Sequence, residues 1–483
     1  MLNFSQWLFE THADKLTKPA VVDNHRTLTY GDLEKHVRHF GCKLLDHGIK
    51  PEQRIVICAD DCVEWPVAFL AALAIGANPV IVNPSLPLSS IQYIIDLSAA
   101  SLVISDQGLD IKSGPLQMTC LENIILDTHG SALTKFYMFH PDERSHWLLT
   151  SGSTGEPSCV VHRHLDLFLL KDYHAAAYQV TADTQMLSTS KLPFAWGFHN
   201  NMCLGLAQGA TLHLINNRVP APSRIFDKIN KYNITHIFLV PAIINALIKH
   251  GRGRKLNKSV TTVVSSGEAL PRSLRDQFLE MYGVDPLDGI GMAEGFNYCS
   301  QTKDLVAPGT CGKPLPGIEC ELRNADGSQT PDGEVGEMWV KHPAAALQYW
   351  NNWEKSKSTF QGPWIKTGDM MIKNSEGNYV HLARVIDLIS INGSKISPTE
   401  IESCLLANHE IDECAVIAGL DKSGKHEIHA FVVSRTLKKS TQVQDIVSNS
   451  LPKQKVPRHV HFVDSLPRTV TGKIGRTVLK QSV

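Results

Sequence analysis

The chain has 483 residues, more than one hydrophobic core normally organises, so we expect at least two domains. Its 47 basic and 48 acidic side chains nearly cancel, which excludes the overall positive field that favours nucleic acid or an anionic membrane surface. The most apolar run, Trp65 to Ile75, is too short to span a bilayer, and the N-terminal segment lacks the pattern of a signal peptide, so we expect a cytoplasmic protein with no membrane partner and no nucleic-acid partner.

Short apolar runs alternate with helical patterns over most of the chain. Strands are predicted at Arg54–Cys58, Pro79–Val82, Thr235–Val240 and Thr261–Val264, and helices at Val63–Ile75 and from Pro241 to about His250. This alternation is typical of parallel sheets covered by helices. Ligands of such sheets bind beyond the carboxyl ends of the strands, where the Gly/Ser-rich turns of this chain fall.

The pattern changes from Cys311 onward. Gly, Pro and Asp turns separate short strands such as Glu337–Val340 and Asn378–His381, which indicates an antiparallel or barrel-like section. A compact stretch follows Arg384. Strands are predicted there at Leu388–Ile391, Cys414–Ile417 and His429–Val433, and a helix is predicted to begin at Ser397–Glu400. We therefore predict an α/β fold with a large N-terminal domain of parallel, helix-covered sheets plus a small barrel-like section, and a small α+β C-terminal domain.

The segment Leu148-Leu-Thr-Ser-Gly-Ser-Thr-Gly155 consists of small and hydroxylated residues after two apolar ones. Its glycines permit tight turns, and its amides and hydroxyls are able to wrap an anion such as a phosphate. A flexible surface loop has the same composition, so the segment alone leaves both interpretations open.

Three further clusters carry groups suited to nucleotide chemistry. Asp288-Gly-Ile-Gly-Met-Ala-Glu294 offers an acid for Mg²⁺, Trp364–Asp369 with Arg384 offers a carboxylate for ribose hydroxyls, and Leu466–Arg476 places a lysine between glycines. Taken singly, each also fits a plain turn, an Asx turn or a basic tail.

In this order the clusters resemble the adenylate-forming superfamily of acyl-CoA synthetases, adenylation domains and luciferases. The resemblance runs from Leu28 to Lys480 through the motifs LLTSGSTG, SSGEALP, GIGMAE, KTGD, INGSKISPTEIE and TVTGKIGR. A P-loop NTPase is a poor alternative, because no Gly-Lys-Ser/Thr follows the loop. Within the superfamily the chain is most similar to the benzoate-CoA ligase group, on the segments Ser190–Gly197, Asp288–Gly291, Cys311–Gly317 and Tyr349–Asn352.

The segment after Lys191 bears on the acid substrate. Phe194 to Phe198 would form a flat aromatic wall for an uncharged planar acid, unless these residues are simply core aromatics. Amino-acid-activating relatives place an Asp here, and none occurs between Lys191 and Asn201, which argues against an α-amino acid.

The resemblance implies that ATP and Mg²⁺ activate the acid to an acyl-adenylate with release of pyrophosphate, and that the acyl group then passes to the thiol of CoA. The implied ATP and AMP site consists of Thr150, Ser151, Gly152, Ser153, Thr154, Gly155, Gly267, Glu268, Ala269, Asp288, Gly289, Ile290, Gly291, Met292, Ala293, Asp369 and Arg384. The implied acid pocket consists of Phe194, Ala195, Trp196, Gly197, Phe198, Ala242 and Gly291.

Catalysis and movement are implied in the same way. Glu294 would hold Mg²⁺, and Lys473 would bridge the carboxylate and the α-phosphate, stabilising charge in the transition state. The implied domains are 1–384 for ATP and acid, a hinge at 385–387 with Ile386 and Asp387, and a mobile domain at 388–483. Rotation about the hinge would withdraw the lysine and bring Gly393 and Ser394 to guide the pantetheine thiol.

Three departures from the family pattern leave alternatives open. Glu156-Pro-Ser-Cys159 replaces the usual Lys-Pro-Lys-Gly, Ala293 replaces the Thr before Glu294, and Ile386 stands where the hinge Asp is usual. One alternative enzyme transfers the acyl group to the phosphopantetheine arm of a carrier protein. A second alternative is an adenylate-binding protein with impaired catalysis. A monomer or a homodimer is expected.

Overall fold

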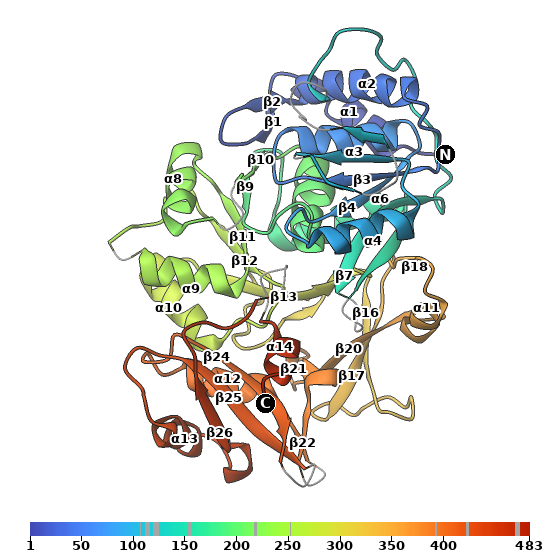
Figure 1. Ribbon diagram of the computed structural model, residues 1–483. Coiled ribbons are helices and arrows are strands. Elements are labelled where there is room, and N and C mark those ends of the chain that lie inside the picture. The colour runs from blue at the N-terminus through green and yellow to red at the C-terminus, as the bar shows by residue number, and fades with distance from the viewer. Residues whose placement is uncertain are drawn as a thin grey trace.

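The computed structural model describes residues 1–106, 108–111, 116–118, 125–151, 156–216, 220–251, 253–391, 394–421, 425–468 and 474–483. In Figure 1 the C-terminal residues, coloured orange and red, form a lobe below the sheets built by the earlier part of the chain. None of the helices in the described part of the chain is long and apolar enough to cross a lipid bilayer.

The first large sheet has seven strands, and its centre is parallel. Their spatial order is β18 (Gln348–Tyr349), β8 (Pro157–Arg163), β7 (Arg144–Ser151), β4 (Asn78–Val82), β3 (Arg54–Cys58), β5 (Leu102–Ser105) and β6 (Leu116–Met118). The helices α3 (Glu64–Ala74) and α4 (Leu88–Ser98) pack on this sheet, and α1 (Phe4–Thr11) and α2 (Tyr30–Asp46) pack against α3. β3 pairs in parallel with β4 and β5, and α3 contacts both β3 and β4. Because both faces are covered, β3 and β4 are almost continuously apolar and buried.

The second large sheet has nine strands. Their spatial order is β15 (Lys313–Pro314), β14 (Phe296–Ser300), β13 (Pro286–Met292), β12 (Thr262–Ser265), β11 (His236–Leu239), β9 (Gln185–Ser188), β10 (Thr211–His213), β1 (Pro19–Val22) and β2 (Thr27–Thr29). Its helices include α6 (Asp166–Tyr178), α8 (Pro222–Tyr232), α9 (Pro241–His250) and α10 (Arg272–Tyr282). β11, β12 and β13 are parallel, so their carboxyl ends lie at one edge of the sheet.

The antiparallel section that the turn pattern predicted is a five-stranded sheet. Its strands are β16 (Glu319–Arg323), β17 (Val335–Lys341), β19 (Phe360–Gln361), β20 (Trp364–Lys373) and β21 (Tyr379–Arg384), with α11 (Trp353–Thr359) before β19. Buried and partly exposed residues alternate along β20, as expected for a strand with one face on a core.

The C-terminal lobe has its own hydrophobic core. Its elements are η4 (Val385–Asp387), β22 (Ile389–Ile391), β23 (Ser394–Ile396), α12 (Pro398–Leu406), β24 (Glu413–Leu420), β25 (His426–Val433), α13 (Ser440–Ser448), η5 (Lys453–Lys455), β26 (His459–Phe462) and α14 (Arg476–Lys480). Ser397 caps α12 by accepting a hydrogen bond from the Glu400 amide at 3.2 Å, and Pro398 occupies the first turn. The α/β fold class predicted from the sequence is confirmed, whereas the division at 385–387 stays a prediction.

Candidate active site

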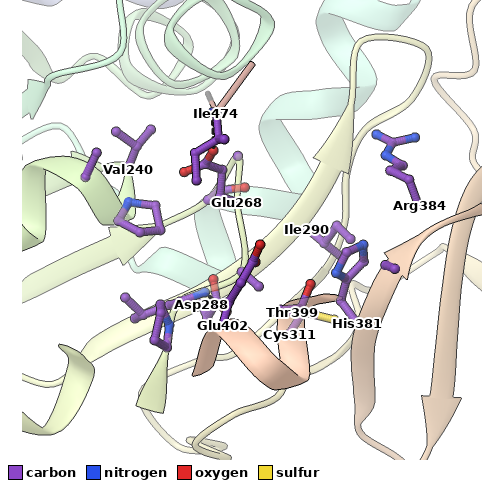
Figure 2. A pocket seen from close by; sticks show the side chains of 18 of the residues that line it. Val240, Glu268, Asp288, Ile290, Cys311, His381, Arg384, Thr399, Glu402 and Ile474 are labelled. Atoms are coloured by element: carbon purple, nitrogen blue, oxygen red, sulfur yellow. Dashed lines mark hydrogen bonds between the residues drawn. The ribbon is translucent and has the colours of Figure 1, made fainter. Parts of the chain in front are cut away.

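A cavity of about 2270 Å³ lies where the carboxyl ends of β11, β12 and β13 meet the β20–β21 hairpin and the C-terminal lobe. Figure 2 shows side chains from all of these parts around it: Val240 and Glu268 after β11 and β12, His381 and Arg384 from β21, and Ile474 from the lobe. This is the sheet edge at which ligands of parallel sheets bind. Most of the predicted site residues line this one space.

The strongest polar network in the cavity surrounds Asp369. Asp369 is 2% exposed. Its carboxylate accepts hydrogen bonds from Tyr298 Oη at 3.3 Å and His381 Nε2 at 3.1 Å, and it pairs with Arg384 Nε at 3.0 Å. Asp369 and Arg384 are register partners in the β20–β21 hairpin, which explains how residues apart in sequence meet. Burial alone would raise the pKa of Asp369, but Arg384 and the hydrogen bonds hold it below its ordinary value. The carboxylate is therefore charged at neutral pH and suited to accept hydroxyl protons in hydrogen bonds.

Glu294 lies in the tight connection between β13 and β14. It is buried, and its Oε1 accepts a hydrogen bond from Tyr349 Oη at 2.5 Å. Burial, and then the Glu294 charge, raise the pKa of Tyr349, so the phenol keeps the proton that it donates. Carboxylate oxygens beside substrate phosphates are ligands that Mg²⁺ prefers, so Glu294 fits the metal role that the resemblance implies.

The residue before Glu294 is Ala293, where the family pattern has Thr. Its carbonyl pairs with His162 Nε2 at 2.8 Å, which holds this connection against β8. His162 is therefore a buried structural partner of the turn. No side-chain hydroxyl is available at position 293 to contact a phosphate.

The loop after β12 and the end of β13 carry further residues of the predicted ATP and AMP site. Gly267, Glu268 and Ala269 line the cavity, as do Asp288 to Ala293. Gly267 has φ +96°, a backbone conformation that glycine adopts without strain. Asp288 accepts hydrogen bonds from the amides of Leu270 at 3.2 Å and Gly289 at 3.0 Å, and burial raises its pKa to about 7. Asp288 thus ties the loop after β12 to β13.

The start of the phosphate loop is placed by β7. Thr150 lines the cavity near the end of this strand. Ser151 ends β7, while Gly152, Ser153, Thr154 and Gly155 lie outside the described residues, so their role stays a prediction. Glu156 is exposed, and Cys159 is fully buried in the core, so the last residue of the unusual flank faces away from the cavity.

One cation near this flank was not predicted from the sequence. Lys355 of α11 lines the cavity, and its Nζ donates to Ser158 Oγ at 3.1 Å and lies 4.0 Å from the centre of the Tyr349 ring. Ser158 stands where the family pattern has its second lysine. The lysine of α11 therefore brings a positive charge to the position where the loop itself has lost one.

The acid pocket requires a correction. Phe194, Ala195, Trp196, Ala242 and Gly291 line the cavity, but Gly197 and Phe198 do not. The segment is not a flat wall, because Ala195–Phe198 is a helical turn (α7) that continues into the π-helix His199–Gly205. The helix turns Phe198 into the core, where its ring lies 5.1 Å from that of Phe69.

Helical geometry also explains why Gly197 does not line the cavity and why His199 does. A Cβ on Gly197 would lie 2.1 Å from the carbonyl oxygen of Lys191, so this glycine is required by close backbone packing rather than by the acid. His199, one turn after Trp196, lines the cavity instead. A helical period applied to residues 194–199 would have selected it.

The C-terminal lobe reaches the cavity through its last segment. The amide of Ile474 donates to Glu268 Oε1 at 3.3 Å, and Figure 2 shows the two side by side. Lys473 and Gly393 lie outside the described residues. Ser394 is exposed and does not line the cavity, whereas Ile386 and Asp387 do. The thiol-guiding and hinge roles stay predictions.

The lobe is also held by ion pairs around the cavity. Lys249 Nζ of α9 pairs with Asp412 Oδ1 of the lobe at 2.5 Å, and inside the lobe Lys480 Nζ of α14 pairs with Asp387 Oδ1 of η4 at 2.9 Å. Within the lobe, Arg476 makes two hydrogen bonds to the Glu402 carboxylate, at 2.7 and 2.9 Å. This pair orients the start of α14, and with it the segment that enters the cavity.

Comparison with known proteins identifies the family of the chain. The profile of the AMP-binding enzyme family matches residues 8–350, and that of the AMP-binding enzyme C-terminal domain matches residues 400–473. The chain is 32% identical over 491 residues to the benzoate–CoA ligase of Thauera aromatica, covering 96% of this chain and 93% of that protein. The solved benzoate CoA ligase from Burkholderia xenovorans LB400 superposes with a TM-score of 0.91 at 32% identity, covering 99% of this chain and 100% of the other.

A second solved structure, the anthranilate CoA ligase AuaEII in complex with anthranoyl-AMP, superposes with a TM-score of 0.93 at 27% identity, covering 100% of this chain and 97% of the other. The resemblance to the adenylate-forming superfamily and to its benzoate-CoA ligase group is confirmed. The chain belongs to the AMP-binding enzyme family.

Proposed function

We propose that this protein activates an aryl carboxylic acid with ATP, forming an acyl-adenylate and pyrophosphate, and then transfers the acyl group to the thiol of CoA. The observation that carries the proposal is the convergence, on one cavity, of a charged Asp369, Glu294, the Gly267–Ala269 loop and the pocket around Phe194 and Trp196. The benzoate and anthranilate ligases named above give the substrate class its support.

In the adenylation step each of these residues has a separate role. Asp369 accepts hydrogen bonds from the ribose hydroxyls, with Arg384 beside it, and the loop after β12 lines the adenine slot. Glu294 would hold Mg²⁺, which would supply positive charge to neutralise the departing pyrophosphate. Phe194 and Trp196 hold the aryl ring so that the carboxylate oxygen meets the α-phosphate, and Lys473 stabilises the negative charge that develops between them.

A carrier-protein phosphopantetheine is the alternative acceptor, because both acceptors present the same thiol. ATP–pyrophosphate exchange with benzoate, hydroxybenzoates, anthranilate, cinnamates and short fatty acids tests adenylation, and AMP release with and without CoA tests transfer. We expect exchange with an aryl acid and AMP release that depends on CoA. Exchange without CoA-dependent release of AMP would favour a carrier protein as the acceptor. If no acid supports exchange, the remaining alternative is an adenylate-binding protein with impaired catalysis. The cytoplasmic location and the choice between monomer and homodimer stay predictions.

Lys355 provides a test of the altered loop flank. Lys355→Met keeps the length of the side chain and removes its charge. We expect KM for ATP in the exchange reaction to rise about tenfold, because a hydrogen bond to a charged group is worth roughly 1.5–3 kcal/mol. Lys357→Met, on the same helix but exposed and outside the cavity, is the matched control and should behave as wild type. Equal KM values in the two variants would contradict the role of Lys355.

A further inference from the structure

The three-stranded sheet of the C-terminal lobe carries a cluster of histidines remote from the cavity. Side chains alternate along β25, so Ile428 and Ala430 face the core of the lobe, whereas Glu427 and His429 face the other side. β26 runs parallel to β25 with His429 opposite His459, which places His459 and His461 on that same side. None of these four polar residues lines the active-site cavity.

The ligand-type atoms of the cluster are close together. One such atom from each of Glu427, His429 and His459 lies within 4.8 Å of the others. His459 Nε2 is 2.8 Å from Glu427 Oε2, and the rings of His429 and His459 are stacked with their centroids 4.4 Å apart. Two imidazoles and a carboxylate thus converge from two adjacent strands.

His429 is the buried member, and one of its ring nitrogens has no partner. The residue is 7% exposed, and its Nδ1 lies 3.1 Å from His461 Nε2. Among the described residues its buried Nε2 has no hydrogen-bond partner, which is costly for a polar atom away from water. A neutral imidazole nitrogen without a hydrogen-bond partner carries a lone pair that can bind a metal.

The backbone of β24 accommodates the His429 ring at a glycine. A Cβ on Gly419 of β24 would lie 2.4 Å from His429 Nε2, so this glycine allows the ring to lie over the sheet. Gly419 is the register partner of Glu427, so Nε2 is directed toward the end of the sheet that carries the carboxylate. The unpartnered nitrogen therefore lies on the side of the His429 ring nearer to Glu427.

We propose that Glu427, His429 and His459 bind a divalent transition-metal ion, and we expect this ion to be Zn²⁺. Zinc–nitrogen and zinc–oxygen bonds of about 2.0–2.2 Å place ligand atoms roughly 3.3 Å from one another. The three atoms already lie within 4.8 Å of one another, so small side-chain rotations bring them to this spacing. Imidazole ligands favour zinc, copper and nickel over Mg²⁺, so this site is chemically distinct from that at Glu294.

Neighbouring groups complete the proposed site. His429 Nδ1 lies 3.1 Å from His461 Nε2, and the tautomer in which Nδ1–H donates to His461 leaves His429 Nε2 free to bind the metal. Arg458 Nη1 lies 2.9 Å from Glu427 Oε1, so the second carboxylate oxygen faces the metal. The His459 side chain is 45% exposed, which gives an ion access from solvent and leaves a position for water.

Zn²⁺ titration of the metal-stripped, full-length protein by calorimetry, under reducing conditions, tests the site. His459→Asn changes an exposed residue, so the fold should persist, and we expect at least tenfold weaker Zn²⁺ binding, with the same result for Glu427→Gln. His426→Asn is the matched control, since His426 is exposed on the same strand but points to the other face, and it should bind Zn²⁺ as wild type does.

A thermal readout separates this site from other zinc-binding side chains. Because the metal would join β25 to β26, Zn²⁺ should raise the Tm of wild type and of His426→Asn but not of His459→Asn. Zn²⁺ isotherms that are identical for His459→Asn and wild type, or wild-type protein that binds no Zn²⁺, would overturn the proposal.

Discussion

Asp369→Asn is expected to lower kcat/KM for ATP in the exchange reaction by about 100-fold or more, since two hydrogen bonds to a charged acceptor are worth roughly 1.5–3 kcal/mol each. The amide keeps the shape of the carboxylate, but it brings an NH₂ group toward the ribose and leaves Arg384 without its anion. The wild-type carboxylate has a pKa below its ordinary value, so at neutral pH the comparison is between a charged and a neutral acceptor. Exchange rates at varied ATP concentration measure the effect.

An analogue of ATP isolates the contact with the ribose. In wild type, 2′-deoxy-ATP should react less well than ATP, whereas in Asp369→Asn the two nucleotides should be nearly equivalent, because the partner of the 2′-hydroxyl is already weakened. Asp332→Asn is the control, because Asp332 is an exposed acid of the same sheet region that pairs with Lys373 outside the cavity. An equal preference for ATP in Asp369→Asn and wild type would refute the ribose assignment.

The sequence predicted the order of the elements well, because that order depends on local patterns. Arg54–Cys58 is a strand with the predicted bounds, and Pro241 opens a helix that ends at His250 as expected. The clustering of Asp369 and Arg384 was predicted from their motifs, and the β20–β21 register supplies the physical reason. Site residues that lie in one loop or one hairpin can thus be predicted from the sequence.

Contacts between distant elements were not predictable in this way. Tyr349 donates to Glu294 from 55 residues away, and Lys355 reaches Ser158 across 197 residues, so no local spacing records either contact. Phe198 was assigned to the acid pocket because its segment is aromatic, yet the direction of each ring depends on the helical turn and on the core behind it. Aromatic composition therefore predicted the neighbourhood of the pocket but not its lining.

The contacts of the structure show what surrounds two departures from the family pattern, Ala293 and Ile386. Ala293 removes a hydroxyl but keeps its carbonyl pairing with His162, so the turn that carries Glu294 is still supported. Ile386 is 77% exposed, and the neighbouring Asp387 is paired with Lys480. Position 386 therefore carries an exposed apolar side chain where the family pattern has a charge, beside an Asp387 that is already paired.

Lys473→Ala is expected to lower the rate of ATP–pyrophosphate exchange by about 100- to 1000-fold, the usual effect of removing one group that stabilises developing charge. Ile474, the next residue, donates to Glu268 at the cavity, and Arg476 is fixed by its two hydrogen bonds to Glu402. Ile474 therefore lies at the cavity wall. ATP affinity, measured by calorimetry, should change less than about threefold, because the lysine acts mainly in the transition state.

The half-reactions separate a catalytic loss from a folding defect. Lys473→Ala supplied with preformed aryl-adenylate should transfer the acyl group to CoA at nearly the wild-type rate, because the lysine is not needed once the adenylate exists. Lys453→Ala, an exposed lysine of the same lobe, should leave both half-reactions intact. Unchanged exchange in Lys473→Ala would refute the assignment of the lysine, and equal losses in both half-reactions would show that the variant disturbs the lobe itself. A selective loss of exchange would place the charge of Lys473 at the adenylation step alone, with the C-terminal lobe delivering it through the contact between Ile474 and Glu268.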